Sequence, residues 1–243
     1  MVRRIDVAVV PSEALVIEAD AYVVVDQLRA TTTIATLFER GLQRLTAVDD
    51  IETARKRAAE TGALLLGEVG GLAPEGFAYG NSPVEVLGAP VEGREAVLFT
   101  SNGTRALCAV GGKGVVAAGA LANVTAICEA ISGRERVVVV CAGTALGTRF
   151  TLEDFAAAGV FVEELLKREP EAAAGDAAAL ALELAKRGEV ERLVRKAEHA
   201  RNVEALGLGE DITFALRRDS SAAVPMVTSC GPGWAVLEDA AQR

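Results

Sequence analysis

One stretch near the N-terminus decides the fold, and it reads Tyr22-Val23-Val24-Val25-Asp26-Gln27-Leu28-Arg29-Ala30-Thr31-Thr32-Thr33. Its first four residues are aromatic or β-branched, which predicts a strand buried on both faces. A polar loop follows, and Thr32 begins a helical pattern that continues to Arg40. A buried strand followed directly by a helix is typical of an α/β protein with a parallel sheet.

The same alternation continues along the chain. Further strands are predicted at 45–48, 63–66, 96–99, 115–118 and 137–140, and further helices at 50–60 and 104–110. We therefore expect a three-layer α/β/α fold with a mostly parallel sheet, formed by a single domain of residues 1–243. Residues 151–206 are almost entirely helical in pattern and are predicted to form a helical cap or an oligomer interface. A short apolar run at Ala222–Val227 is predicted to add a last strand.

The composition excludes several classes of protein. Hydrophobic residues make up 51% of the 243 residues and the mean hydropathy is +0.29, values that indicate a globular chain. No apolar run approaches the roughly 18 residues that span a bilayer, and the N-terminus lacks the pattern of a signal peptide. The net charge of −9, without a basic run, argues against nucleic-acid binding. We therefore expect neither a membrane nor a nucleic acid as partner.

The cysteines and the histidine argue against a zinc site. Cys108, Cys128, Cys141 and Cys230 form no CxxC pair, and His199 is the only histidine. Reduced cysteines predict a cytoplasmic protein. Because the chain is acidic overall, any anion site needs local Arg, Lys or metal charge.

Three predicted strands end in a polar loop that contains an arginine and opens a helix. The loops are 26–33, 100–105 and 141–149. Ligands of open parallel sheets bind beyond the carboxyl ends of the strands, where helix N-termini present free N–H groups. The loops predict a phosphate-sized cradle with arginines for bidentate contacts. Its candidate substrate-binding residues are Thr31, Thr32, Asn102, Gly103, Thr104, Arg105, Gly143, Thr144 and Arg149. Asp, Thr and Asn after a strand are also ordinary N-caps, and this alternative stays open for each loop.

A fourth loop, Gly67–Pro83, contains five glycines and two prolines. Glu68 stands directly at the end of the preceding strand, and Asn81 and Ser82, near the end of the loop, are further candidate substrate-binding residues. Long loops without regular structure are uncommon inside compact domains and are often functional. The alternative is a flexible surface loop.

The carboxylates near these loops suggest a metal site. Thr151 followed by Asp154 resembles a capping box, so capping is one role for Asp154. The adjacent Glu153 and Asp154 are also candidate metal ligands, together with Glu68. Mg²⁺ prefers oxygen ligands and usually needs only one or two carboxylates besides water and substrate oxygens. Both readings of Asp154 remain open.

Known phosphate motifs are absent from the sequence. Asp26 follows an apolar strand as a haloacid-dehalogenase nucleophile does, but Leu28 replaces the second aspartate of that pattern. Cys141 is separated from Arg149 by more residues than the Cys-x5-Arg motif of cysteine phosphatases allows. Neither a P-loop nor a dinucleotide fingerprint occurs. His199 lies in a helical stretch, where a lone histidine is usually a surface or satisfied residue.

The sequence resembles the 2-phosphosulfolactate phosphatase family of coenzyme M biosynthesis. The resemblance extends over nearly the whole chain and rests on DQLRATTT at 26–33, GEVGGLAPEGFAYGNSP at 67–83, TSNGTRAL at 100–107, GALANV at 119–124, CAGT at 141–144, TLEDFAAAG at 151–159 and EDITFALRRDSSAAVP at 210–225. The neighbourhood of Arg201 and Asn202 departs from the Gly-rich pattern of the family. The resemblance implies Mg²⁺-dependent hydrolysis of 2-phospho-3-sulfolactate to 3-sulfolactate and phosphate, in an α/β/α fold.

These observations give a mechanistic hypothesis. Asp26 either attacks phosphorus or activates water, and Arg29 with the N–H groups of Thr31 and Thr32 holds phosphoryl oxygens. Asn102, Arg105 and Arg149 are expected to hold the carboxylate or sulfonate end. The alternatives are a phosphatase for another phosphorylated 2-hydroxy acid and a non-catalytic anion-binding module. The Ala-rich helices after Leu152 favour a homodimer.

Overall fold

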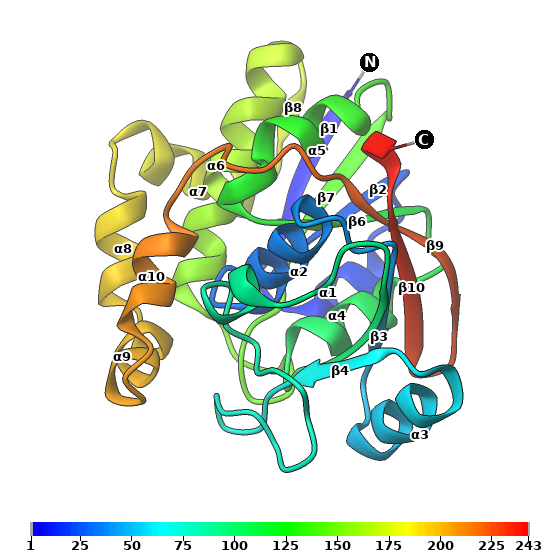
Figure 1. The fold of residues 1–243 in the computed structure, drawn as a ribbon. Helices are drawn as coiled ribbons and strands as arrows, with labels where there is room; N and C mark the ends of the chain where they lie inside the picture. Colours follow the sequence, from blue (N-terminus) through cyan, green and yellow to red (C-terminus); the bar gives the residue numbers. More distant parts are fainter. Residues whose placement is uncertain (1, 243) are drawn as a thin grey trace.

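The structure is a computed structural model that describes residues 2–242. Within this range the strands form one sheet in the order β4-β5-β3-β10-β9-β6-β2-β7-β1-β8 (Figure 1). The strands are β1 Arg4–Ala8, β2 Ala21–Val25, β3 Arg44–Val48, β4 Leu64–Gly67, β5 Glu95–Phe99, β6 Val115–Gly119, β7 Arg136–Cys141, β8 Ala173–Ala174, β9 Pro225–Gly231 and β10 Trp234–Asp239. Most neighbouring strands pair in parallel, as the sequence predicts for an α/β fold.

Helices surround this sheet, which confirms the predicted fold class. The α-helices are α1 Pro11–Val16, α2 Ala30–Glu39, α3 Ile51–Thr61, α4 Gly103–Val110, α5 Val124–Ala130, α6 Leu152–Arg168, α7 Asp176–Lys186, α8 Val190–Lys196, α9 Glu198–Ala205 and α10 Gly209–Ala215. Short 3₁₀ helices occupy Glu85–Gly88, Leu121–Asn123 and Ala240–Gln242. Most predicted strands and helices agree with these bounds to within about two residues, the usual uncertainty of element ends.

The sheet consists of two parallel blocks joined by a hairpin. One block is β6-β2-β7-β1-β8 and the other is β4-β5-β3. Between them, β3 pairs antiparallel with β10, β10 with β9, and β9 with β6. Three antiparallel steps reverse the direction of the strands, so the two blocks run in opposite senses along the sheet.

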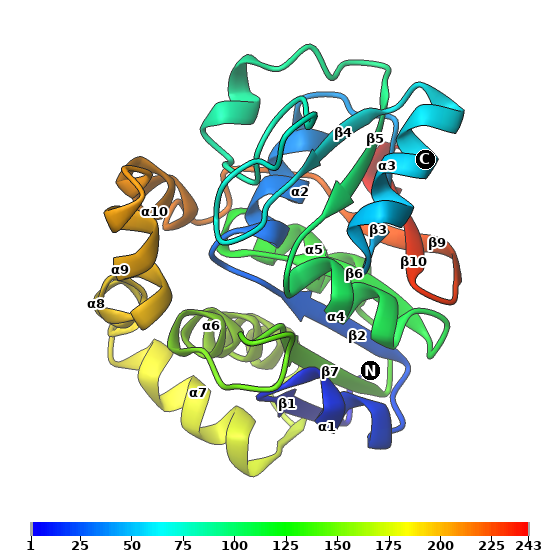
Figure 2. The ribbon, with the colours of Figure 1, turned by 90° about the horizontal axis from the view of Figure 1, so that it is seen from below.

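Both blocks nevertheless share one core. Alternate residues of β2 point to opposite faces, so Val24 joins the side chains of α1, α2 and α4, whereas Val23 faces α5 and α6. Leu98 of β5 packs into the same cluster as Val24. Figure 2 shows α4 between β2 and β3, and both strands contact this helix. The sheet therefore curves around α1, α2 and α4, while α5 to α7 cover the outer face of the first block and α3 that of the second.

Three strands of the sheet, β1, β8 and β10, were not predicted from the sequence. β10 forms a hairpin with β9, and the predicted run at Ala222–Val227 covers only the start of that hairpin. β1 reads Arg-Ile-Asp-Val-Ala, and Asp6 is a buried charge between two buried apolar residues. A buried charge is tolerated in a strand only when it is paired.

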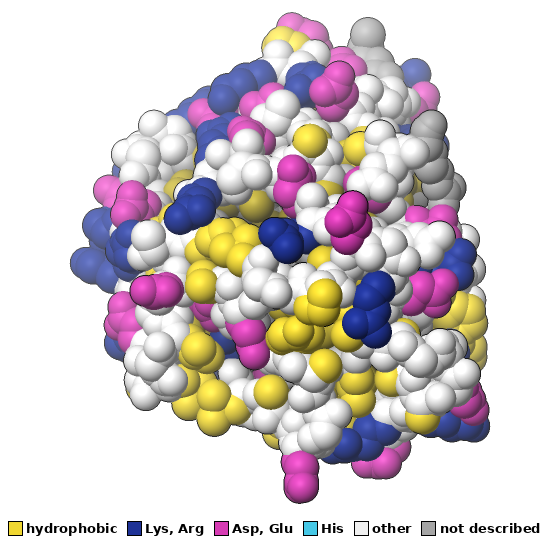
Figure 3. Space-filling model, viewed as in Figure 1, with side chains coloured by type: hydrophobic (Ala, Val, Ile, Leu, Met, Phe, Trp, Pro, Cys, Tyr) yellow, Lys and Arg dark blue, Asp and Glu magenta, His cyan; other side chains and the backbone are white. Residues whose placement is uncertain are grey.

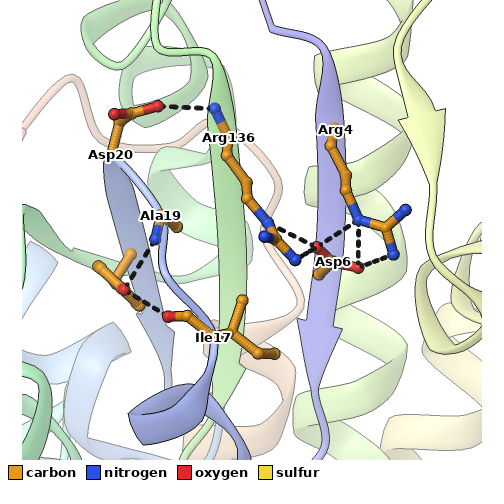
Figure 4. Close-up of polar contacts among 7 residues, drawn as sticks. Arg4, Asp6, Ile17, Ala19, Asp20 and Arg136 are labelled. Atoms are coloured by element: carbon orange, nitrogen blue, oxygen red, sulfur yellow. Dashed lines mark hydrogen bonds and ion pairs between the residues drawn. The ribbon is translucent and has the colours of Figure 1, made fainter.

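Asp6 is paired with two arginines, Arg4 of its own strand β1 and Arg136 of the neighbouring strand β7. Arg4 and Arg136 are opposite each other in the parallel ladder of β1 and β7, and both guanidinium groups point toward Asp6 (Figure 4). Arg4 donates to both carboxylate oxygens at 2.8–3.1 Å, and Arg136 donates to Oδ2 at 3.0 and 3.2 Å. These contacts stabilise β1 beside β7 in spite of the charge of Asp6.

The surface carries charges of both signs. On the face drawn in Figure 3, basic and acidic side chains are interspersed, with apolar side chains between them. Among the residues that the structure describes, no helix combines the length and the apolar character needed to cross a bilayer.

Candidate active site

A cavity of about 510 Å³ opens where the ends of several strands meet. Asp26 follows β2, Glu68 follows β4, Asn102 follows β5 and Thr144 follows β7, so each of the four loops singled out in the sequence contributes to its wall. The remaining wall comes from the helical subregion, which consists of α8, α9 and α10 (residues 190–215). The full lining is Asp26, Leu28, Arg29, Glu68, Gly70, Gly71, Asn81, Ser101, Asn102, Thr144, Ala145, Leu146, His199, Asn202, Val203, Ala205 and Leu206.

The N-termini of α2 and α4 meet at this cavity. A Cβ atom built on Gly103, the first residue of α4, would lie 2.5 Å from the Cβ of Ala30 and 2.5 Å from Oδ2 of Asp26. Only glycine allows this close approach of the two helices. Because helix N-termini carry partial positive charge and free N–H groups, their meeting point favours an anion.

Asp26 lies at this meeting point. Its side chain is buried, and Oδ1 accepts a hydrogen bond from the backbone N–H of Ala30 at 3.2 Å. Burial raises the pKa of Asp26 to about 6, and the nearby charge of Glu68 adds to the rise. A carboxylate with a pKa near neutrality is suited to accept a proton at physiological pH.

Glu68 ties two loops together. Its Oε1 accepts from the backbone N–H of Ser101 at 2.7 Å, and its Oε2 accepts from that of Gly71 at 2.8 Å. Gly71 has a φ of 89°, a conformation that L residues rarely adopt. The glycines of this loop therefore let the backbone wrap around the Glu68 carboxylate beside the cavity.

Arg29 lines the cavity but its guanidinium is already held. Nη1 donates to Oδ2 of Asp211 at 2.8 Å and Nη2 donates to the carbonyl oxygen of Gly71 at 2.6 Å. Both charged side chains of this ion pair are 2% exposed. Asp211 was not among the predicted site residues, because a single acid in α10 has no local pattern that indicates a distant partner.

The predicted metal ligands Glu153 and Asp154 lie outside the cavity wall. Asp154 accepts hydrogen bonds from the backbone N–H groups of Gln27 at 2.9 Å and Gly143 at 3.0 Å, and from the Thr151 hydroxyl at 2.7 Å. Asp154 therefore connects the loop after β2 to the loop after β7, without itself lining the cavity. Burial, with the charges of Glu153 and Asp26, raises the pKa of Asp154 well above its usual range.

Glu153 is 2% exposed at the start of α6. Burial raises the pKa of Glu153 to about 7, and the charge of Asp26 also contributes. The structure thus places Glu153 near Asp26 but not on the surface of the cavity.

Several predicted substrate-binding residues make contacts inside the protein. The Thr31 N–H and hydroxyl both donate to the carbonyl oxygen of Asp26, and the Thr32 hydroxyl donates to that of Gln27. The Thr104 hydroxyl donates to the carbonyl oxygen of Thr100 at 2.9 Å. These threonines shape the turns that carry the cavity residues.

Two predicted arginines lie elsewhere. Arg105 donates through Nη2 to the carbonyl oxygen of Asp49 at 2.9 Å, on the side of α4 that faces β3, and it does not line the cavity. Arg149 is exposed, and its backbone pairs with that of Thr144. Gly143 contributes its backbone N–H to Asp154, and Ser82 donates to Oδ1 of Asp211 at 2.6 Å.

Two asparagine oxygens have no hydrogen-bond partner among the residues that the structure describes. Oδ1 of Asn81 and Oδ1 of Asn102 are buried atoms without a hydrogen bond, and both residues line the cavity. Asn81 is 4% exposed, so its side chain is almost completely removed from bulk water. Buried polar atoms are rarely left unpaired, so these oxygens indicate positions where a ligand makes a contact.

Helix α9 lies in the segment that the sequence predicts as a helical cap or an oligomer interface, but none of its residues was predicted at the site. His199, Asn202, Val203 and Leu206 recur at helical spacing and form one face, which covers the cavity. The helical spacing of these residues can be recognised in the sequence. The sequence does not indicate which part of the protein this face packs against. Burial and the charge of Arg29 lower the pKa of His199. Leu28 packs under α8 to α10 and holds this helical subregion against the strand end.

Comparisons with known proteins identify the family of this chain. The family model described as 2-phosphosulpholactate phosphatase matches residues 10–229. A protein of Thermotoga maritima named probable 2-phosphosulfolactate phosphatase is 34% identical over 227 residues, which cover 93% of this chain and 96% of the relative. A Deinococcus radiodurans protein of the same name is 38% identical over 213 residues, covering 85% and 87% of the two chains. The chain belongs to the 2-phosphosulpholactate phosphatase family.

Proposed function

We propose that this chain is a phosphoric monoester hydrolase that converts 2-phospho-3-sulfolactate to 3-sulfolactate and phosphate with the help of Mg²⁺. The observation that carries the proposal is the placement of Asp26 in a cavity where two helix N-termini meet. Membership of the family, with relatives named for this activity, supports the same reaction and substrate.

The oxygen atoms around the cavity fit Mg²⁺. Among the residues that the structure describes, no three Asp, Glu, His or Cys side chains gather into a ready metal cluster. Mg²⁺ needs no such cluster, because it commonly uses one or two carboxylates, water and substrate oxygens. Asp26 and Glu68 supply two carboxylates, and the unpaired oxygens of Asn81 and Asn102 are further donors. When bound, Mg²⁺ would neutralise charge on the phosphoryl oxygens.

The residues of the chain supply the remaining chemistry. Uncatalysed hydrolysis of phosphate monoesters is so slow that catalysis must lower the barrier by about 20 kcal/mol or more, mainly through positioning and charge stabilisation. Asp26 either takes a proton from the attacking water or attacks phosphorus itself. Arg29 and the N-termini of α2 and α4 offer positive charge to the phosphoryl group.

The far end of the substrate needs a revised assignment. The Arg105 guanidinium lies at Asp49, and Arg149 does not line the cavity. Asn102, Thr144 and the polar residues of α9 are the side chains near the rest of the cavity. We therefore assign recognition of the carboxylate or sulfonate to Asn102 and Thr144, in place of the two arginines.

Phosphate release from 2-phosphosulfolactate and 2-phospholactate, each with Mg²⁺ and with EDTA, tests the proposal. Metal-dependent turnover that favours the sulfonate supports it. Metal-dependent turnover without preference would support the phosphatase activity but would contradict 2-phospho-3-sulfolactate as the specific substrate. Absence of turnover with these and a wider set of phosphomonoesters would leave anion binding as the remaining function.

One observation favours a second candidate substrate. Leu28, Leu146, Val203 and Leu206 form an apolar part of the cavity wall. Within residues 2–242, Arg29 is the only Arg or Lys in the lining. A phosphorylated 2-hydroxy acid with an apolar end would suit this wall better than a second strong anion. Phospholactate analogues with longer alkyl groups distinguish the two candidates by their kcat/KM.

The setting of the reaction is part of the same proposal. The substrate places the chain in coenzyme M biosynthesis, and the four cysteines are free thiols, as expected in the cytoplasm. Leu180 of α7 is 58% exposed, and an exposed leucine on this helix is compatible with the expected homodimer. Light scattering of the purified protein tests the oligomeric state.

A further inference from the structure

Helix α10 reaches the active site through one buried acid. Asp211 is in the first turn of this helix and its side chain is 2% exposed. At the other end of the helix, the side-chain amide of Gln27 donates to the carbonyl oxygen of Ala215 at 2.6 Å. This contact and the Asp211–Arg29 ion pair join α10 to the turn between β2 and α2, which carries Asp26 and Arg29.

Asp211 uses its two carboxylate oxygens for two different segments. Oδ2 accepts from Nη1 of Arg29 at 2.8 Å, and Oδ1 accepts from the hydroxyl of Ser82 at 2.6 Å. Ser82 belongs to the long loop Gly67–Pro83, and the Ser82 hydroxyl in turn accepts from the N–H of Glu85 at 3.1 Å. Asp211 therefore joins three segments that are far apart in the sequence.

The contacts continue from Arg29 into the cavity wall. Nη2 of Arg29 donates to the carbonyl oxygen of Gly71, and the N–H of Gly71 donates to Oε2 of Glu68. Leu206 of the helical subregion also presses on Gly71, where an added Cβ would lie 2.5 Å from the Leu206 Cδ1 atom. The orientation of Arg29 thus depends on Asp211 and on Gly71, and Gly71 in turn supports Glu68.

A buried guanidinium needs such partners. Removing Arg29 from water is costly unless its charge is compensated and its N–H groups are paired. Its planar fork has a defined direction, so two acceptors on different segments determine where it points. Glu210, the neighbour of Asp211 in the same helical turn, is exposed. Its carboxylate accepts no hydrogen bond from Arg29 or Ser82 in the part of the chain that the structure describes.

We propose that Asp211 is a positioning residue for the phosphatase reaction: it orients Arg29 toward the cavity and, through Ser82, fastens the loop Gly67–Pro83 to the helical subregion. This inference rests on the function proposed above only for its kinetic test. The fastening of the loop is a property of the folded chain and is measured without substrate.

The test compares three variants with the wild type. Asp211→Asn removes the charge but keeps the shape of the side chain, Ser82→Ala removes one hydrogen bond, and Glu210→Gln is the matched control. We expect Asp211→Asn to lower kcat/KM by up to about 100-fold, because small displacements of positioning groups carry such costs. Ser82→Ala should have a smaller effect in the same direction, and Glu210→Gln none.

KM and the inhibition constant of inorganic phosphate separate positioning from simple loss of structure. Neither constant depends on the fraction of folded enzyme, so a purely structural role for Asp211 changes only the apparent kcat. We expect both constants to rise at least several-fold in Asp211→Asn. The double variant with Ser82→Ala should add little to Asp211→Asn, because both changes act through one network.

Hydrogen exchange of the loop gives a readout independent of activity. Amides within 67–83 should exchange faster in Asp211→Asn and Ser82→Ala than in Glu210→Gln and the wild type. Unchanged exchange together with unchanged KM and phosphate inhibition would overturn the inference. If the wild type lacks phosphatase activity, the proposed function fails, while faster loop exchange in Asp211→Asn still supports the fastening role.

Discussion

Gly103 lies so close to Asp26 that a Cβ atom at residue 103 would be 2.5 Å from Oδ2 of the aspartate. Gly103 begins α4 and Asp26 directly follows β2, so this contact joins the two blocks of the sheet beside the cavity. A side chain at residue 103 would have to displace either the Asp26 carboxylate or the first turn of α2.

Gly103→Ala should therefore impair the enzyme strongly. We expect a loss of stability of about 1–3 kcal/mol from overpacking and a fall in kcat/KM of at least about 10-fold, because Asp26 is displaced. Gly88→Ala is the matched control, since an added Cβ there meets no atom within 4 Å. Thermal unfolding and phosphate release with both variants measure the two effects. Full activity of Gly103→Ala would contradict the proposed position of Asp26.

Asp26→Asn tests the catalytic role proposed for Asp26. Loss of a general base or nucleophile should lower kcat by about 100-fold or more. If Asp26→Asn keeps more than about a tenth of wild-type turnover, Asp26 is neither the general base nor the nucleophile. Circular dichroism and thermal unfolding of the same sample show whether the fold is kept.

The same variant should be more stable than the wild type above pH 6. The pKa of Asp26 is about 6 in the folded protein, above its ordinary value of 3.8. Between these two pH values the folded state binds more protons than the unfolded state, so the free energy of unfolding falls as pH rises through this window. Asp26→Asn abolishes this loss and should be more stable by about 2–3 kcal/mol at pH 7, with no difference below pH 4. Urea unfolding in EDTA across this range is the measurement.

The metal assignment predicts different outcomes for the candidate ligands. Glu68→Gln should raise the Mg²⁺ concentration needed for half-maximal activity by at least about 10-fold, because Glu68 lines the cavity. Glu75→Gln, at an exposed position of the same loop, serves as control. If Glu153→Gln raises the Mg²⁺ requirement as much as Glu68→Gln does, Glu153 is a metal ligand after all.

The pair of arginines around Asp6 predicts an effect on stability alone. Asp6→Asn should lower the melting temperature by a few degrees, because Arg4 and Arg136 lose their shared acceptor charge. Asp6 lies outside the cavity, so KM should not change. A change in KM without a change in melting temperature would contradict this separation.

The sequence by itself determined the α/β class and most of the elements, because burial and helical or strand periodicity are local properties of the chain. The turn after Val25, for example, predicts a strand end and a helix start without knowledge of any partner. Asp26, Glu68 and Asn102 were found in this way, since polar residues after buried strands are recognisable in the sequence.

Only the tertiary structure decided which of these residues meet. The hairpin of β9 and β10 reverses the second parallel block, and the curvature of the sheet around α2 and α4 brings the ends of β2 and β5 together. Arg105 and Arg29 follow strands in similar loops, yet Arg105 contacts Asp49 and Arg29 is paired with Asp211. The partner of a side chain depends on packing between segments that are distant in sequence, and such packing leaves no periodic signal in the chain itself.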